Sequence, residues 1–201
     1  PIKQQSSSLG ITPQPNEMVV NLIPQYLFFN EKIKIQLHPN NSLVFNCINN
    51  YIGWGEYFKI IKQTLNALKK GELFHSYSRI GIRYISEFPN IDISDKINFS
   101  YKLNVLNKAI DSGNFRMEWG DSSNKITMNL GVKLPIMVST TLEETKINYI
   151  SLIDIDVINQ GFNFNTNKEL FLLINETHTK QKQLFFKMLT KEFLKTLNPV
   201  Y

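Results

Sequence analysis

Two arginines, Arg79 and Arg83, lie in the mainly apolar stretch SRIGIRYISEF, residues 78–88. The alternation of side chains predicts a β-strand, which places both guanidinium groups on one face with Gly81 between them. A guanidinium group donates hydrogen bonds in a fork that fits a phosphate or a carboxylate. The pair can therefore bind an anionic ligand, or it can pair with acidic side chains of the same sheet.

A second polar pair, Asp154 and Asp156, falls on one face of the strand predicted over residues 145–161. If this strand is a neighbour of the arginine strand, cross-strand pairs between arginine and aspartate stabilise the sheet. We favour this structural pairing. A ligand-binding site formed by Arg79, Arg83, Asp154 and Asp156 is our second interpretation.

The same two aspartates are also candidates for a divalent metal site. Two carboxylates on one strand can hold Mg²⁺ or Mn²⁺, as in a metal-dependent phosphodiesterase. Such a site needs a third acidic ligand and often a lysine, and the sequence offers Glu118 and Lys133 without placing them. We therefore predict no metal, no cofactor and no catalytic residue.

The remaining polar and aromatic candidates have structural interpretations. Trp54, Tyr57 and Phe58 could stack nucleic-acid bases, but their helical spacing is typical of core residues. Glu176 and His178 are about 200° apart on a helix and cannot hold one metal ion. His178 belongs to the apolar stripe of that helix, so we interpret it as a core histidine. With three histidines and one cysteine, a zinc site is close to excluded.

Composition restricts the class of protein further. The chain of 201 residues is 42% hydrophobic and 19% charged, which is typical of a globular protein. A single cysteine, Cys47, rules out a disulfide within the chain and favours a cytosolic location, and no apolar run reaches the ~20 residues of a membrane span. The net charge of +5 favours acidic partners or nucleic acid only weakly. The start without Met suggests a trimmed chain.

Periodicity predicts the elements that position these residues. They are an apolar segment before residue 30 that forms an edge strand or lies across the core, a hairpin over 32–48, a helix over 54–70 with Gly71 as C-cap, the strand 78–88, a hairpin over 114–134, the strand 145–161, and a long C-terminal helix over 166–197 that bends near NETHT or breaks. We expect an α+β fold, an antiparallel sheet built from hairpins with two long helices packed on one face.

The expected domain organisation follows from these elements. Residues 1–20 are a flexible lead-in, and residues 21–201 form a single domain. That domain can also be divided into two half-units, 21–88 and 113–201, joined by a linker with a short helix over 89–112.

Several motifs, in this order, resemble a sporadically distributed bacterial protein family of undefined function. They are WGEYF with Trp54 and Tyr57, RIGIRYI over Arg79–Ile85 with Gly81 and Tyr84, DIDV over Asp154–Val157, and a last helix with Glu176, His178, Leu189 and Thr190. The similarity covers residues from about 20 to the end. The opening strand and helix of that family have no counterpart in the given sequence, either because this part is absent or because it precedes the first residue given; a missing strand would leave an open sheet edge. The resemblance implies no activity, ligand or catalytic residue.

These observations lead to three hypotheses about function. The first is a non-enzymatic cytosolic interaction protein that binds a protein partner or itself through exposed sheet edges, without contact with a membrane. The second is a nucleic-acid-binding protein of a mobile-element or defence system, with Arg79 and Arg83 on its surface. The third is the metal-dependent phosphodiesterase that would use Asp154 and Asp156.

Overall fold

A computed structural model describes residues 24–48, 50–99, 112–136 and 148–197 of the chain. The fold is α+β, with two antiparallel sheets and helices. The chain divides into two compact units, residues 1–64 and 65–201. None of the helices in the described part is both long enough and apolar enough to cross a membrane.

The first unit contains a three-stranded sheet with the order β1-β2-β3, formed by β1 (Tyr26–Phe29), β2 (Ile33–Leu37) and β3 (Leu43–Cys47). Both connections are antiparallel hairpins. The turn between β1 and β2 forms because the side-chain oxygen of Asn30 accepts hydrogen bonds from two backbone N–H groups of the turn. The predicted hairpin over residues 32–48 is thus confirmed.

Helix α1 (Trp54–Lys70) follows the small sheet. An acidic residue lies in its first turn and two lysines in its last turn, which suits the helix dipole. The backbone N–H of Gly71 donates to the carbonyl of Ala67 at 3.0 Å, where the sequence predicts the C-cap. Ile61 and Leu65 are its buried positions.

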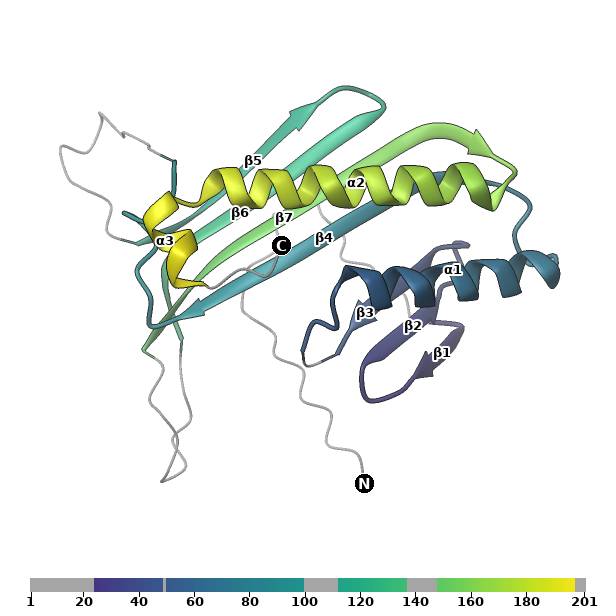
Figure 1. The fold of residues 1–201 in the computed structure, drawn as a ribbon, viewed down its shortest axis with the longest axis horizontal. Helices are drawn as coiled ribbons and strands as arrows, with labels where there is room; N and C mark the ends of the chain where they lie inside the picture. Colours follow the sequence, from purple (N-terminus) through teal and green to yellow (C-terminus); the bar gives the residue numbers. More distant parts are fainter. Residues whose placement is uncertain (1–23, 49, 100–111, 137–147, 198–201) are drawn as a thin grey trace. The chain divides into compact units, whose positions relative to one another are not determined.

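The second unit contains a four-stranded antiparallel sheet, whose strands appear side by side in Figure 1. It consists of β4 (Tyr77–Pro89), β5 (Gly113–Gly120), β6 (Asn124–Pro135) and β7 (Tyr149–Phe164), in the order β4-β7-β6-β5. The strand that carries the arginines is therefore a direct neighbour of the strand that carries the aspartates. This neighbourhood is the condition on which the predicted pairing depended.

Helix α2 (Asn167–Met188) lies along one face of this sheet (Figure 1). The side chain of Asn159 on β7 donates to the hydroxyl of Thr177 on α2 at 2.7 Å, so odd-numbered residues of β7 face the helix. Fully buried Ile153, Ile155 and Val157 form the core on this face. A second long helix on the same face stays a prediction.

The C-terminal helical segment is not one helix. The chain is helical through NETHT, where a bend was predicted, and α2 ends at Met188. The hydroxyl of Thr190 accepts the N–H of Phe193 and starts the separate helix α3 (Lys191–Thr196). The apolar periodicity predicts one long helix, but a new N-cap at Thr190 separates it into α2 and α3.

The domain boundaries stay a prediction. Strand β4 belongs to the predicted half-unit 21–88 and pairs with β7 of the half-unit 113–201, so one sheet contains strands of both. The lead-in 1–20 and most of the predicted short linker helix, residues 100–111, lie outside the described residues.

Candidate functional site

The two arginines and the two aspartates meet on the sheet face opposite α2. Arg83 lies directly across from Asp156 in the β4–β7 register, and both alternate with residues that face the helix. Alternation predicts that each pair shares one face of its own strand, and the β4–β7 register brings the two pairs to the same face of the sheet. What the arrangement can do depends on which charges are already paired.

Arg83 and Asp154 form a forked ion pair. Nε of Arg83 donates to Oδ1 of Asp154 at 2.8 Å, and Nη2 donates to Oδ2 at 2.7 Å. Asn129 on β6 donates a third hydrogen bond to Oδ2 at 2.8 Å. The side chain of Asp154 is only 6% exposed, whereas that of Arg83 is 56% exposed. The hydrogen bonds to Asp154 raise the pKa of Arg83 above its ordinary value. This carboxylate is therefore bound within the sheet.

Asp156 has a different environment. Its carboxylate lies beside Gly81 of β4, where an added methyl group would be 3.5 Å from Oδ1, an ordinary contact distance. Within the described part of the chain Asp156 accepts no hydrogen bond. Burial raises the pKa of Asp156 above its ordinary value, against the smaller opposing effects of Arg83 and Arg79.

Arg79 is exposed and forms no ion pair within the described residues. Its register partner on β7 is Gln160, not an aspartate. Of the two expected arginine–aspartate pairs, the structure therefore contains one. In the described structure Arg79 is therefore accessible to an anionic ligand, although it also acts electrostatically on Asp156.

The other residues suggested for a metal site are paired elsewhere. Glu118 lies between Arg116 at 2.7 Å and Lys125 at 2.8 Å, which lower the pKa of its carboxyl group to about 2, Lys125 more strongly. Lys133 forms an ion pair with Asp92 at 2.9 Å. Among the described residues, no group of three or more His, Cys, Asp or Glu side chains could hold a metal ion.

The remaining signature residues have packing roles. The ring of His178 on α2 lies 5.9 Å from that of Tyr84 on β4, and burial lowers the pKa of His178 to about 4. Trp54 stacks on Phe58 with 5.0 Å between ring centroids. The hydroxyl of Tyr57 donates to the carbonyl of Phe45 at 2.9 Å.

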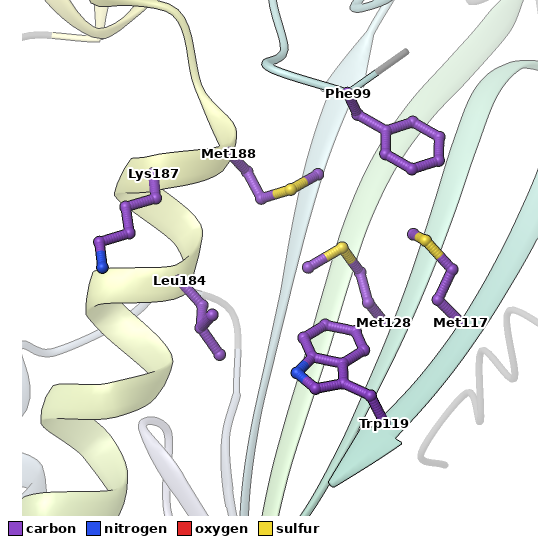
Figure 2. A pocket seen from close by; sticks show the side chains of 7 residues that line it. All are labelled: Phe99, Met117, Trp119, Met128, Leu184, Lys187 and Met188. Atoms are coloured by element: carbon purple, nitrogen blue, oxygen red, sulfur yellow. The ribbon is translucent and has the colours of Figure 1, made fainter. Parts of the chain in front are cut away.

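An apolar cavity of about 240 Å³ lies between the last turns of α2 and strands β5 and β6 (Figure 2). It is lined by Phe99, Met117, Trp119, Met128, Leu184, Lys187 and Met188. Figure 2 shows Met128 and Met188 directed towards one another from sheet and helix, with the ammonium group of Lys187 pointing away. The described lining can accept an apolar group, and it directs no charged group inward that could orient a substrate. This site could not be predicted from the sequence, because its residues come from four separate segments.

The most unusual surface is strand β1. Its four residues Tyr26, Leu27, Phe28 and Phe29 are 53%, 46%, 62% and 65% exposed, although all are large and apolar. Both faces of the strand are exposed, and within the described residues β1 pairs with β2 alone. A strand with these properties is a template for pairing with another chain.

The other three sheet edges are protected. Tyr57 covers the edge of β3, since its hydroxyl binds the outward carbonyl of Phe45. Strand β4 carries Arg79, Arg83 and Glu87, and strand β5 carries Arg116 and Glu118. Charged side chains on an edge strand oppose pairing with other chains. Among the described edges, β1 is the one without such protection.

Comparison with known proteins gives no relative: no family model, no curated protein and no solved structure matches this chain. The candidate site therefore depends on geometry alone.

Proposed function

We propose that this protein is a non-enzymatic interaction module that binds a protein strand along β1. The observation that carries the proposal is the exposure of four consecutive apolar residues, Tyr26–Phe29, on a strand with one open edge. A strand added at such an edge gains main-chain hydrogen bonds, and its alternate side chains cover apolar residues on both faces. A cytosolic location, drawn from the single cysteine, is part of the proposal.

The proposal needs no catalytic chemistry. On the sheet face opposite α2, Asp154 is held by Arg83 and Asn129, and Glu118 is paired. The cavity beside α2 has apolar lining atoms and no charged group directed into it. The exposed apolar surface of β1, in contrast, has a free-energy cost in water that binding would remove.

The test compares immobilised wild-type protein with two edge variants in capture experiments from a lysate of the source cells. Leu27→Pro removes one outward N–H, and Phe29→Lys adds a charge at the edge. Leu172→Lys is the matched control, because Leu172 is 59% exposed on α2 and far along the chain from β1. We expect specific partners to be lost with both edge variants and retained with the control. Equal capture by all four proteins would refute the role of β1.

Nucleic-acid binding is the alternative supported by Arg79, which is exposed and without an ion pair in the described structure. Its support is narrow, because Arg83 and Arg116 are already paired with carboxylates. Affinity for DNA or RNA should fall steeply as salt rises and should fall further in Arg79→Ala. An absence of binding at low salt would eliminate this alternative.

The metal-dependent phosphodiesterase is the weakest alternative. It would have to use Asp154, which already accepts three hydrogen bonds, together with Asp156. It predicts Mg²⁺- or Mn²⁺-dependent hydrolysis of a phosphodiester such as bis(p-nitrophenyl) phosphate that is lost in Asp156→Asn. Hydrolysis that survives in this variant would count against it.

A further inference from the structure

We infer that the strand bound by β1 is β1 of a second copy, in an antiparallel register centred on Phe28. This inference rests on the proposed function and names its partner. It follows from which backbone groups of β1 point outward, from the side chains that the register brings together, and from the absence of charge along the strand.

The hydrogen-bond pattern of the hairpin determines the free backbone groups. The N–H of Asn30 donates to the carbonyl of Ile33 at 3.0 Å, which makes this a hydrogen-bonded pair. Such pairs alternate along antiparallel strands, so Tyr26 and Phe28 also bind β2. The N–H and C=O groups of Leu27 and Phe29 therefore point to the open edge.

A twofold axis at Phe28 uses all of these outward groups. Leu27 of one copy then lies opposite Phe29 of the other, and each of these two pairs exchanges two backbone hydrogen bonds. Phe28 faces its own copy in the non-hydrogen-bonded pair at the centre, where Cα atoms are roughly 4.5 Å apart. The interface is isologous, so it closes as a dimer and does not propagate into a fibre.

The side chains of the two copies suit one another. No charged residue lies between Pro24 and Asn30. In this register Glu31 lies opposite Gln25, and Lys32 lies opposite Pro24, so no like charges meet. The two faces bring together Leu27 with Phe29 and Phe28 with Phe28, which are favourable cross-strand pairs.

The size of the interface indicates its strength. Four half-exposed apolar side chains offer roughly 400 Å² on each copy, given the area that an aromatic side chain buries. The total is at the low end for specific association. We therefore expect a dimer that dissociates on dilution into roughly the micromolar range.

Disulfide cross-linking tests the register. In a Cys47→Ser background, Phe28→Cys places two thiols at the central pair, where the spacing permits a disulfide. In Leu27→Cys or Phe29→Cys alone, equivalent residues are roughly 7–8 Å apart across a diagonal, which is too far. We expect covalent dimer under mild oxidation from Phe28→Cys, little from the other two, and a mixed dimer when those two are combined.

Light scattering after size-exclusion chromatography tests the dimer without cysteine variants. Wild type should shift from monomer to dimer mass as concentration rises, while Leu27→Pro stays a monomer with unchanged circular dichroism. Leu27 donates outward and not to β2, so a proline there leaves the hairpin bonds intact. The control Leu172→Lys should behave as wild type.

Two results would overturn the inference. One is cross-linking by Leu27→Cys alone that equals or exceeds cross-linking by Phe28→Cys. The other is a wild-type chain that stays monomeric at several hundred micromolar. If that monomer still captures partners that Leu27→Pro loses, the second-copy inference fails and the proposed function stands. If edge-dependent capture is absent as well, both fail.

Discussion

Two aspartates on one strand face provide a sharp test of the electrostatic reasoning. Asp154→Asn and Asp156→Asn make the same chemical change two residues apart on β7, and both raise the net charge by one. At neutral pH we expect Asp154→Asn to lower the free energy of unfolding and Asp156→Asn not to lower it, because in the described structure only Asp154 is held by hydrogen-bond donors.

Asp154→Asn should destabilise the protein by about 2 kcal/mol. A hydrogen bond to a charged group contributes about 1.5–3 kcal/mol, and the amide places a donor where the carboxylate accepted three bonds. The half-exposed Arg83 can turn to water when its partner is lost, which limits the loss. In a protein of this size the change lowers Tm by roughly 4–8 °C.

Asp156→Asn should leave stability at or above that of wild type at pH 7. Burial raises the pKa of Asp156, so its charged form is disfavoured in the folded protein. A raised folded pKa means that the stability contribution is complete below the unfolded pKa and is lost as pH rises through the folded pKa. The advantage of the variant should therefore be absent at pH near 3.8 and develop as pH rises.

Urea unfolding followed by circular dichroism at several pH values measures both effects. Glu87→Gln is the control for net charge, since Glu87 is an exposed carboxylate on the same face of β4. If Asp156→Asn loses as much stability as Asp154→Asn, the attraction of Asp156 to its arginine neighbours outweighs its burial and the reasoning is refuted. If Asp154→Asn is neutral, the forked pair with Arg83 contributes nothing measurable.

Three further predictions concern the second unit. Gly131→Ala should cost about 1–3 kcal/mol in urea unfolding, because the new methyl group would lie 2.6 Å and 2.9 Å from two leucine side chains, whereas Gly71→Ala meets atoms only at 3.6 Å or beyond. Burial lowers the pKa of His178 from 6.5 to about 4. The contribution of the neutral ring to stability is therefore complete above pH 6.5 and is lost as pH falls towards 4. His178→Gln should flatten this part of a curve of Tm against pH. Thr177→Val should lower the free energy of unfolding by about 1–3 kcal/mol, since it leaves the buried amide of Asn159 without its 2.7 Å acceptor; a second change, Asn159→Leu, should recover part of that loss.

Sequence alternation predicts the faces of the strands well. Ile82 and Tyr84 face α2 whereas Arg79 and Arg83 do not, as a period of two requires. The same reasoning places Asp154 on the arginine face. Local patterns determine faces because the geometry of a strand leaves no other choice once one side is buried.

The pairing within that face could not be predicted. Alternation does not give the register between β4 and β7, so it could not show that Arg83 lies opposite Asp156 yet binds Asp154. Asn129, which donates the third hydrogen bond to Asp154, comes from β6 and has no signal in the sequence. A break in the long C-terminal helix was expected, but its position after Met188 was not predicted, although Thr190 with Glu192 and Phe193 after it has the composition of an N-cap.

The exposure of β1 is best explained by what a small sheet needs. In the described part of the first unit, three short strands and the first turns of α1 bury little apolar surface, so this unit gains much from any additional strand. The β3 edge already has Tyr57 bound to an outward carbonyl, and extension on that side would have to displace it. Extension at β1 displaces no residue of the described structure and covers Phe28 and Phe29, the two most exposed residues of the strand. Selection against aggregation normally places a charge or a proline inside such a strand. Neither a charged residue nor a proline lies between Gln25 and Asn30, as we expect of an edge strand whose partner is another protein strand.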